Sequence, residues 1–499
     1  MGLKSVLSKV FAWFVVKDIE KWKFNAVAAQ EKVLKQLVKE ATATVFGADH
    51  QFSAIKNYED FKAHVPIRDY EDLRPYIDRV VAGEPDILWK AKPVYLAKTS
   101  GTTSGVKYIP ISKQSMPAHV KAARNALLTY IHETGNASFV DGKVIFLQGS
   151  PVLTKKNGIN VGRLSGIVAH LVPAYLQKNR MPSYETNCIE DWERKVDAIV
   201  DETIKADMRL ISGIPPWVQM YFDKLTEKSG GKKIKDIFKN FELFVYGGVN
   251  YEPYRAKIET SIGKKIAAIE TYPASEGFIA YQDSQTDKGL LLLANAGMFY
   301  EFIPAEEYYN EKPTRLSLAE VELDKNYALI LNTNAGLWGY SIGDTVKFVS
   351  LNPYKILVTG RIKHFISAFG EHVIAEEVEH ALLSVANQEG VEITEFTVAP
   401  QVNAPNGELP YHEWLVEFAK EPSDLKTFAL KVDKALQQKN IYYFDLIEGN
   451  ILQPLKITPL AKDTFVNYMK AQGKLGGQNK VPRLSNDRKI AEGLEEYIV

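Results

Sequence analysis

The sequence predicts an α/β protein with two domains, and three observations support this prediction. Short apolar runs typical of strands alternate with amphipathic helical segments over most of the 499 residues. The chain is longer than one hydrophobic core usually organises, because a domain holds roughly 100 to 200 residues. The pattern of strands and helices also restarts near residue 359. We therefore expect a large N-terminal domain, residues 1–358, with mixed β-sheets and flanking helices, and a smaller C-terminal α+β domain, residues 359–499.

Within the expected large domain, helical and strand-like segments follow in a regular order. Residues 17–46 place apolar side chains at helical spacing, which predicts a long helical N-terminal region ending near Thr44. Two apolar runs, residues 93–97 and 108–111, predict a pair of strands around a turn-forming segment. The remaining expected elements are helices at 112–131, 190–203 and 216–225 and strands at 144–147, 208–212, 241–246, 265–270 and 290–293.

The expected small domain begins where a strand at 355–358 gives way to the sequence Thr359-Gly360-Arg361. The pattern then predicts helices at 374–385 and 425–438 and strands at 394–399 and 413–418, followed by a basic, glycine-rich tail. A segment of this length can form an independent domain.

The composition excludes several classes of function. Lys plus Arg (61) balances Asp plus Glu (61), so no overall positive charge attracts nucleic acid, and we expect no nucleic-acid partner. The single cysteine, Cys188, excludes an intrachain disulfide framework and a multi-cysteine metal site, and it fits a reducing compartment. We expect a cytoplasmic protein in which Cys188 is a buried apolar side chain.

The N-terminus could be mistaken for a signal peptide, because residues 6–16 are apolar apart from Ser8 and Lys9. No small-residue cleavage site follows, and charged residues begin again at Lys17. The apolar run is also too short to span a membrane. We expect an amphipathic helix packed on the protein and no membrane partner, with attachment to a membrane surface as the less favoured alternative.

Residues 98–110 read K-T-S-G-T-T-S-G-V-K-Y-I-P and combine two features of phosphate-binding loops. Gly101 and Gly105 can adopt positive φ and let the backbone approach a ligand. The hydroxyls and the cation that could bind an anion belong to Thr99, Ser100, Thr102, Thr103, Ser104 and Lys107. A Walker A loop is excluded, because Val106 precedes the lysine and a strand follows it. The segment is either a phosphate loop of another kind or a solvated hairpin turn.

Two clusters of candidate site residues, each with one acidic side chain, lie beside expected strands. In T-Y-P-A-S-E-G, residues 271–277, Glu276 could bind Mg²⁺ that bridges nucleotide phosphates, and the neighbouring aromatic residue could stack on a base. In G-L-W-G-Y-S-I-G-D, residues 336–344, Asp344 is expected just before a strand at 345–349 and could accept hydrogen bonds from both ribose hydroxyls. The alternatives are a surface turn with a solvated Glu276 and an ordinary β-turn acid at Asp344.

A third cluster, G-G-Q-N-K-V-P-R, lies in the tail at residues 476–483. Lys480 could deliver a positive charge to an anionic transition state if the small domain moves over the large one. Otherwise this segment is a basic, disordered C-terminal tail.

In order and spacing, these clusters resemble the acyl-acid amido synthetases of the auxin-responsive Gretchen Hagen 3 family, in particular a bacterial-type member. That family belongs to the adenylate-forming superfamily, with acyl-CoA synthetases, peptide-synthetase adenylation domains and luciferases. The resemblance covers nearly the whole chain, and each motif alone is modest whereas their order is highly specific. The matching segments are V-P-I-R-D-Y-E-D-L-R-P-Y-I (65–77), the loop and its Lys-Tyr-Ile-Pro continuation (98–110), Y-G-G-V-N-Y-E-P-Y (246–254), T-Y-P-A-S-E-G (271–277), A-G-L-W-G-Y-S-I-G-D (335–344) and Q-N-K-V-P-R (478–483).

The resemblance implies ATP and Mg²⁺ as cofactors and assigns a role to each matching position. Glu276 would contact Mg²⁺, Lys480 would be the catalytic lysine of a mobile small domain, and Arg361 would lie at the hinge between the domains. The residues implied in nucleotide binding are Ser100, Gly101, Thr102, Thr103 and Ser104 for the phosphates, Tyr272 and Ser275 for the adenine and acyl-adenylate, and Asp344 for the ribose.

One residue and one segment depart from the family pattern. Plant-type members usually show Tyr-Arg-Val-Gly-Asp where this chain has Ser341 in place of the arginine. Residues 360–373, G-R-I-K-H-F-I-S-A-F-G-E-H-V, resemble the hinge of acyl-CoA synthetases more than that of the plant amido synthetases.

The resemblance implies ATP-dependent adenylation of a small carboxylic acid, followed by domain rotation and transfer of the acyl group to the amine of an amino acid. The alternatives are an acyl-CoA ligase, which would use the thiol of coenzyme A, and a non-catalytic nucleotide- or acyl-binding protein. We expect the acyl pocket between the helix at 112–131, the segment 162–170 and the wall at 246–251, with His170 in a structural role. The sequence specifies neither the acid nor the oligomeric state.

Overall fold

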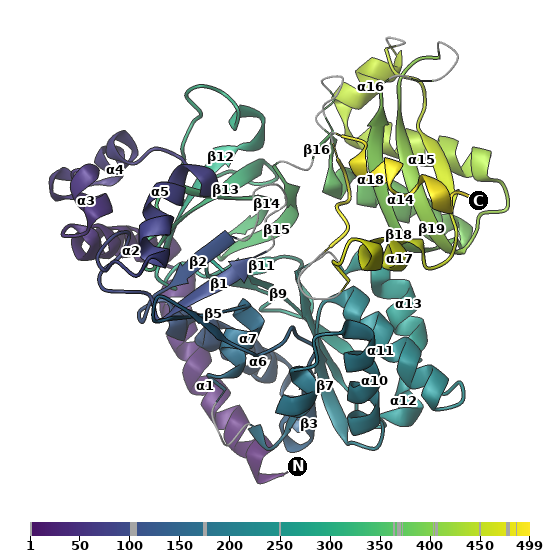
Figure 1. The fold of residues 1–499 in the computed structure, drawn as a ribbon, viewed down its shortest axis with the longest axis horizontal. Coiled ribbons are helices and arrows are strands. Elements are labelled where there is room, and N and C mark those ends of the chain that lie inside the picture. Colours follow the sequence, from purple (N-terminus) through teal and green to yellow (C-terminus); the bar gives the residue numbers. More distant parts are fainter. Residues whose placement is uncertain are drawn as a thin grey trace. The chain divides into compact units, whose positions relative to one another are not determined.

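The computed structural model describes residues 2–99, 107–172, 177–248, 251–362, 365–366, 371, 373–402, 404, 408–448, 451–475, 480–485 and 487–499. The chain forms two compact units (Figure 1). The first unit comprises Met1–Gly248 and Ile262–Val358, and the second comprises Val249–Ser261 and Thr359–Val499. Both are mixtures of helices and strands, so the predicted α/β class is confirmed.

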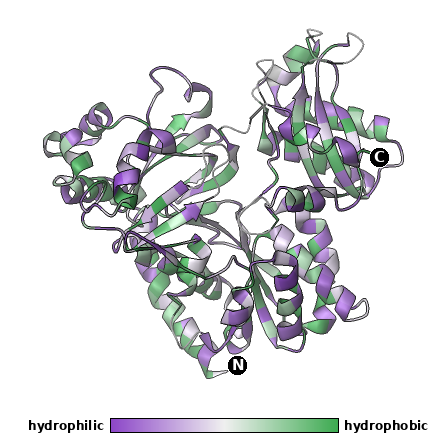
Figure 2. Ribbon diagram, in the orientation of Figure 1, coloured by the Kyte–Doolittle hydropathy of each residue, from purple (hydrophilic) through white to green (hydrophobic). Residues whose placement is uncertain are grey.

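The larger sheet of the first unit has eleven strands among the described residues, in the order β12-β13-β14-β15-β11-β10-β9-β8-β7-β3-β6. Its parallel part contains β3 (Lys143–Phe146), β6 (Arg180–Met181), β7 (Met208–Ser212), β8 (Leu243–Gly247) and β9 (Ala267–Pro273). The other strands are β10 (Phe278–Tyr281), β11 (Leu290–Leu292), β12 (Met298–Pro304), β13 (Asn326–Thr333), β14 (Tyr340–Leu351) and β15 (Tyr354–Arg361). Many of these strands are apolar along their whole length, because both of their faces are covered (Figure 2).

A second, four-stranded sheet has the order β2-β1-β5-β4, with β4 at Thr154–Lys156 and β5 at Ile159–Gly162. The predicted strand pair is confirmed, because β1 (Tyr95–Thr99) and β2 (Lys107–Ile111) pair antiparallel with Thr99 opposite Lys107. An aromatic core joins this sheet to the neighbouring helices, and it includes Phe46, Phe52, Phe61 and Trp338. The helices near this core are α2 (Ala26–Ala41), α3 (Val45–Asp49), α4 (Tyr58–His64) and α5 (Tyr70–Val81), with a 3-10 turn η1 (Phe52–Ala54).

The single N-terminal helical region that we predicted is two helices, α1 (Leu3–Lys23) and α2. The helix breaks because the backbone N–H of Asn25 bonds to the Trp22 carbonyl and its side-chain amide bonds to the Lys21 carbonyl. Helix α1 packs along α6 (Met116–Thr134). Further helices of this unit are α7 (Leu164–Ala169), α9 (Tyr184–Asn187), α10 (Trp192–Thr203), α11 (Pro215–Lys228) and α12 (Ile234–Ile237), with 3-10 turns η2 (Ser138–Asp141) and η3 (Ala305–Glu307).

The second unit contains a three-stranded sheet in the order β18-β19-β20. Strands β18 (Glu392–Gln401) and β19 (Tyr411–Lys420) are antiparallel, and β20 (Lys456–Leu460) runs parallel to β19. The remaining elements are α13 (Glu252–Ile262), most of which belongs to this unit, β16 (Phe365–Ile366), β17 (Val373–Ile374), α14 (Ala375–Glu389), α15 (Leu425–Lys439), α16 (Ile441–Glu448), α17 (Thr464–Ala471), α18 (Lys489–Glu492) and the 3-10 turn η5 (Glu495–Tyr497).

The described part of the C-terminal tail is folded, so the alternative of a disordered tail is wrong for residues 480–485 and 487–499. Leu484 is fully buried and forms a β-bridge with Val398, and Ala491 and Leu494 are buried in a small apolar cluster. Within the described ranges, we find no helix whose length and apolar character would let it cross a membrane.

Candidate active site

Two of the predicted site residues, Tyr272 and Asp344, are in direct contact. The Tyr272 hydroxyl donates a 2.6 Å hydrogen bond to a carboxylate oxygen of Asp344. Three strands, β15, β11 and β10, separate their strands β9 and β14 in the sheet order, so this contact is not a cross-strand neighbour pair. Tyr272 is buried and Asp344 is half-buried, which leaves the carboxylate partly accessible.

A bulge in β14 directs Asp344 out of the ladder. Thr345 pairs with Ala328 and Ser341 pairs with Ile330, so three residues of β14 stand opposite the single residue between them in β13. Gly343 within this bulge has φ of 83°, a left-handed conformation that favours glycine. We predicted that Asp344 precedes a strand, and this is wrong: it lies within a strand that the bulge interrupts.

Ser275 and Glu276 lie in the hairpin turn between β9 and β10. The turn is closed by hydrogen bonds between Ala274 and Gly277 in both directions, of 2.9 and 3.2 Å. Ser275 is buried and Glu276 is partly exposed, so the carboxylate of Glu276 remains reachable from solvent while the turn holds its position.

The carboxyl ends of the parallel strands meet next to this turn, where α/β sheets usually bind ligands. The Thr271 hydroxyl donates a 2.9 Å hydrogen bond to the Tyr246 carbonyl, which joins the ends of β9 and β8. A Cβ at Gly247 would lie 2.3 Å from the Thr271 carbonyl oxygen, so only glycine fits there. Tyr246 and Tyr251, the ends of the predicted acyl-pocket wall, are both buried.

Only the two ends of the predicted phosphate loop belong to the described residues. At the base of the β1–β2 hairpin, Lys98 pairs with Tyr108 and Lys107 pairs with Thr99, so the two lysines lie on opposite faces of the sheet. The loop itself, with the predicted residues Ser100, Gly101, Thr102, Thr103 and Ser104, lies outside the described residues.

Most of the segment 335–344 has a structural role. Leu337, Trp338 and Tyr340 are buried in the aromatic core, and the Trp338 indole N–H donates a 3.0 Å hydrogen bond to the Leu88 carbonyl. Of this motif, Asp344 is therefore the residue best placed for chemistry.

The donor set fits a nucleotide and a single magnesium ion. A half-buried carboxylate held by a tyrosine suits a ribose diol, because both hydroxyls can donate to it. The described residues contain no cluster of three or more acidic, histidine or cysteine side chains that could hold a metal alone. One carboxylate, such as that of Glu276, is the usual protein contribution to Mg²⁺ whose other ligands are phosphates and waters.

Comparison with known proteins decides the family. The N-terminal, central and C-terminal domain models of the GH3 family match residues 15–186, 291–361 and 376–489. The chain belongs to the GH3 family. Together the three matches cover well over half of its length, and they include the Asp344 bulge and Lys480.

Relatives and solved structures agree with this assignment. The indole-3-acetic acid-amido synthetase GH3.3 of Arabidopsis thaliana is 22% identical over 97% of this chain and 93% of its own. The jasmonoyl–L-amino acid synthetase JAR4 of Nicotiana attenuata is 22% identical over 67% of this chain and 68% of its own. The structure of the GH3.15 acyl acid amido synthetase superposes with a TM-score of 0.79 at 16% identity, over 97% of this chain and 96% of that one. A 2-hydroxyisobutyryl-CoA ligase structure in the postadenylation state gives 0.57 at 14% identity, over 95% and 89%.

In this GH3 chain, Lys480 and Arg361 belong to the second unit, whereas Tyr272, Ser275, Glu276 and Asp344 belong to the first. Arg361 ends β15 and is exposed, as is Lys480. The structure therefore brings together the Tyr272–Asp344 part of the predicted site.

Arg483, to which sequence analysis gave no role, anchors the segment that carries Lys480. Its side chain is 12% exposed and donates hydrogen bonds to Glu379 (3.0 Å), to the Phe396 carbonyl (3.2 Å) and to Glu395. The backbone adds two further bonds, from Val398 N–H to the Arg483 carbonyl and from the Thr397 hydroxyl to the Pro482 carbonyl. A single arginine in a basic tail carries no sequence signal for such a role.

Lys195 is a second residue that sequence analysis missed. It is 1% exposed, and its ammonium donates to the carbonyls of Gln148 (2.9 Å) and Asn187 (2.7 Å), just beyond the end of β3. Burial lowers the pKa of Lys195 to about 8. Its position in a charged amphipathic helix gave no signal, because most lysines there are solvated.

Three further residues named in the sequence analysis are Ser341, Cys188 and His170. Ser341, which replaces the arginine of plant-type members, is buried and accepts a 2.8 Å hydrogen bond from the Tyr308 hydroxyl. Cys188 is only partly buried, because it caps the C-terminal end of the short helix α9 at the surface, so the prediction of a buried side chain is wrong. His170 bonds through Nε2 to the Pro151 carbonyl at 2.8 Å, as a structural histidine would.

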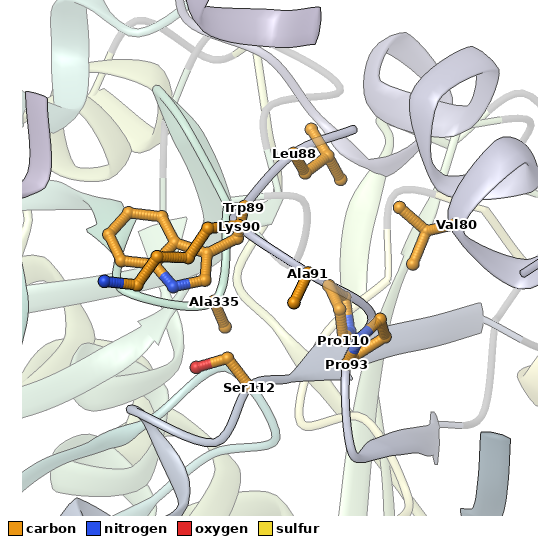
Figure 3. Close-up of a pocket in the computed structure, with 9 residues that line it drawn as sticks. All are labelled: Val80, Leu88, Trp89, Lys90, Ala91, Pro93, Pro110, Ser112 and Ala335. Carbon is orange, nitrogen blue, oxygen red and sulfur yellow. The ribbon is translucent and has the colours of Figure 1, made fainter. Parts of the chain in front are cut away.

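A small pocket in the first unit is separate from these residues (Figure 3). Its lining includes Leu88, Trp89, Pro93, Pro110 and Ser112, and none of the predicted site residues contributes to it. The lining is mostly apolar, so the pocket lacks the set of charged and polar groups that a nucleotide requires.

Proposed function

We propose that this GH3 protein is an acyl-acid amido synthetase that uses ATP to convert a carboxylic acid into an acyl-adenylate and then transfers the acyl group to an amino acid amine. The observation that carries the proposal is the Tyr272–Asp344 hydrogen bond, which holds a carboxylate ready beside the carboxyl ends of the parallel strands. Family membership and the names of the GH3 relatives support the same reaction.

Each site residue would act by binding and orienting. Asp344 would accept hydrogen bonds from the ribose hydroxyls, while Tyr272 fixes that carboxylate and lines the adenine site together with Ser275. The loop residues Ser100, Gly101, Thr102, Thr103 and Ser104 would hold the phosphates. Because the carboxylate substrate attacks the α-phosphate without losing a proton, alignment and positive charge are the main demands on the protein.

Two positively charged groups would neutralise the negative charge on the phosphates. Glu276 would hold Mg²⁺, which supplies positive charge to the phosphate oxygens when it is bound. Lys480 would supply a second positive charge from the mobile small domain, residues 359–499, with Arg361 at the hinge. The bonds of Arg483 to Glu379 and Glu395 would keep the lysine-bearing segment in one conformation.

The shape of the acyl pocket would determine which carboxylic acid the protein uses. The relatives are named for different acids, indole-3-acetic acid and jasmonic acid among them, so a relative's name does not specify the acid used by this chain. We propose that the segment 162–170, which includes α7, and the wall at 246–251 line the acyl pocket. One methylene in such a pocket changes specificity by only about 1 to 3 kcal/mol.

A coenzyme A ligase is the second candidate, because residues 360–373 resemble the hinge of acyl-CoA synthetases. The 2-hydroxyisobutyryl-CoA ligase shares the fold. Both candidates predict the same first half-reaction, so the acceptor decides between them.

Pyrophosphate release distinguishes the candidates. The purified protein is given ATP, Mg²⁺ and a panel of aromatic and aliphatic carboxylic acids, each without acceptor, with an amino acid mixture, or with coenzyme A. We expect turnover that one class of acid supports and that amino acids stimulate.

Stimulation by coenzyme A but not by amino acids would replace the amido synthetase proposal with the ligase. ATP binding without pyrophosphate release under any condition would contradict both and leave a non-catalytic binding protein.

A further inference from the structure

One face of α1 exposes a continuous row of large apolar side chains. Leu3, Leu7 and Phe14 are 76%, 60% and 60% exposed, and the other members of the row are Val6, Val10, Phe11 and Trp13. They recur at spacings of three and four residues, so they lie on one side of the helix. A helix with apolar residues around most of its circumference is normally buried, whereas this one lies at the surface of its unit (Figure 2).

The opposite face of α1 is fixed to the protein, so the exposed row cannot turn inward. Ala12, Val16 and Ile19 are buried, the first and last of them in a cluster shared with α6. The Ser5 hydroxyl bonds to the Ala137 carbonyl at 2.9 Å and to Asp141 at 2.6 Å. These contacts fix the rotation of the helix about its axis.

Positive charges surround the apolar row. In a helix of 3.6 residues per turn, Lys4 and Lys9 fall at its two edges. Lys17 lies 3.7 Å from the centre of the Trp13 ring, and Arg124 of α6 lies 5.5 Å from that of Phe11. Residues 3–17 contain no Asp or Glu, although acids and bases balance over the whole chain.

We propose that this face of α1 docks on an anionic lipid surface, with Trp13, Phe14 and Leu7 at the level of the headgroups and upper acyl chains. Aromatic and leucine side chains on one face, with lysines at its borders, are the features of helices that lie in a membrane interface. The lysine stems can reach outward to the phosphates while their charged ends stay hydrated.

The same observations argue against a second copy of the chain as the occupant. Two identical faces placed together would bring the lysines of both copies close, and the nearby acid Asp18 already pairs with Lys21 at 3.2 Å. This proposal does not depend on the proposed enzymatic function.

Co-sedimentation with vesicles tests the proposal. The full-length protein is mixed at low ionic strength with vesicles of phosphatidylcholine alone or of phosphatidylcholine with 30% phosphatidylglycerol. We expect binding to the anionic vesicles that weakens with salt, and a reduction of at least tenfold for the double variant Leu7→Gln, Phe14→Gln. Gln keeps the helix propensity and adds no charge.

The matched control is the double variant Tyr309→Gln, Leu430→Gln, which removes two comparably exposed apolar side chains elsewhere (60% and 46% exposed) and should bind like the unmodified protein. A second variant, Lys4→Gln, Lys9→Gln, should lose binding to anionic vesicles about tenfold. Circular dichroism and thermal unfolding confirm that all variants are folded.

Quenching by brominated lipid reports the geometry of binding. Trp13 is the only tryptophan among the described residues that is more than 40% exposed, so part of the fluorescence should be quenched, and Trp13→Phe should abolish quenching while the protein still sediments. Failure of the folded protein to bind anionic vesicles at low salt would overturn the proposal. Sedimentation velocity that shows a dimer dispersed by Leu7→Gln, Phe14→Gln, without vesicle binding, would assign the face to a second copy.

Discussion

The bond between Tyr272 and Asp344 gives the candidate site its geometry. The Tyr272 hydroxyl donates a 2.6 Å hydrogen bond to the Asp344 carboxylate, and this bond restricts the rotation of the carboxylate. The two residues therefore contribute differently. Asp344 would bind the ribose of the nucleotide, whereas Tyr272 would line the adenine site and also position Asp344.

Substitution of the pair should separate these contributions. Asp344→Asn should raise the KM for ATP about 10- to 100-fold, because hydrogen bonds to a charged group are worth about 1.5 to 3 kcal/mol. Tyr272→Phe should raise it about fivefold, and the double variant should show less than the sum of the two free-energy changes. Tyr309→Phe, at an exposed tyrosine, is the control for loss of a hydroxyl. Unchanged KM values for ATP in both single variants would show that this pair is not part of the nucleotide site.

Lys195 should make stability depend on pH in a defined window. Its pKa is about 8 in the folded protein and 10.5 ordinarily, so between these values the unfolded chain binds more protons and stability rises with pH. Relative to Lys195→Met, the free energy of unfolding of the unmodified protein should rise by about 2 kcal/mol from pH 7.5 to pH 9.5. Urea denaturation at both pH values measures this difference. The exposed Lys205→Met is the control, and equal pH dependence in all three proteins would contradict the account.

The role of a single residue could be predicted where the residue stands in a recognisable motif. It could not be predicted where the role depends on burial in the folded protein. Asp344 and Tyr272 stand in recognisable motifs, so the sequence identified both, but nothing in it indicated that they touch across three intervening strands. Lys195 and Arg483 were missed because a lysine in a helix and an arginine in a tail are usually solvated. Their importance comes from burial, which depends on the whole fold.

The β14 bulge is the element that aims Asp344. Three residues of β14 stand opposite one residue of β13, so Asp344 lies outside the regular register of the two strands, and Gly343 provides the left-handed residue of this bulge. A regular β14 would place Asp344 in the ladder instead.

Replacing the bulge glycine should therefore cost activity as well as stability. Gly343→Ala should destabilise the protein by about 1 to 2 kcal/mol, because alanine is strained at positive φ, and should lower the rate of adenylation more than tenfold. Gly158→Ala is the matched control, since Gly158 has φ of 82° with open space around its Cβ position. Both variants should lose similar stability in thermal unfolding, but Gly158→Ala should keep its activity. Equal activity of the two variants would show that the bulge has no role in aiming Asp344.

Regular elements were easier to predict than irregular ones. The β1–β2 pair and several of the longer helices, α6, α10, α11, α14 and α15, followed from apolar spacing and turn residues, since those signals are local. The division between α1 and α2 and the inclusion of Asp344 within β14 were missed. A capping interaction at Asn25 and a bulge both depend on single hydrogen bonds that periodicity does not report.

The two units divide the proposed chemistry between them. Tyr272 and Asp344 lie in the first unit and Lys480 in the second, so the proposed reaction would need both. A lysine used only in adenylation predicts a selective defect: Lys480→Ala should slow pyrophosphate release on the order of 100-fold or more, while transfer from a chemically prepared acyl-adenylate to the acceptor is retained. Lys474→Ala, at an exposed lysine of the same unit, should affect neither step. Equal loss in both half-reactions would contradict this division.

The central claim is that a carboxylate oxygen attacks the α-phosphate of ATP, and isotope transfer tests it directly. The acid that supports turnover is labelled with ¹⁸O in its carboxylate and incubated with ATP, Mg²⁺ and the acceptor, and the nucleotide products are analysed by mass spectrometry. The account predicts AMP that carries one ¹⁸O atom from the acid, together with unlabelled pyrophosphate. Unlabelled AMP, or ADP with labelled phosphate, would contradict it, because the acid would then be activated by another route.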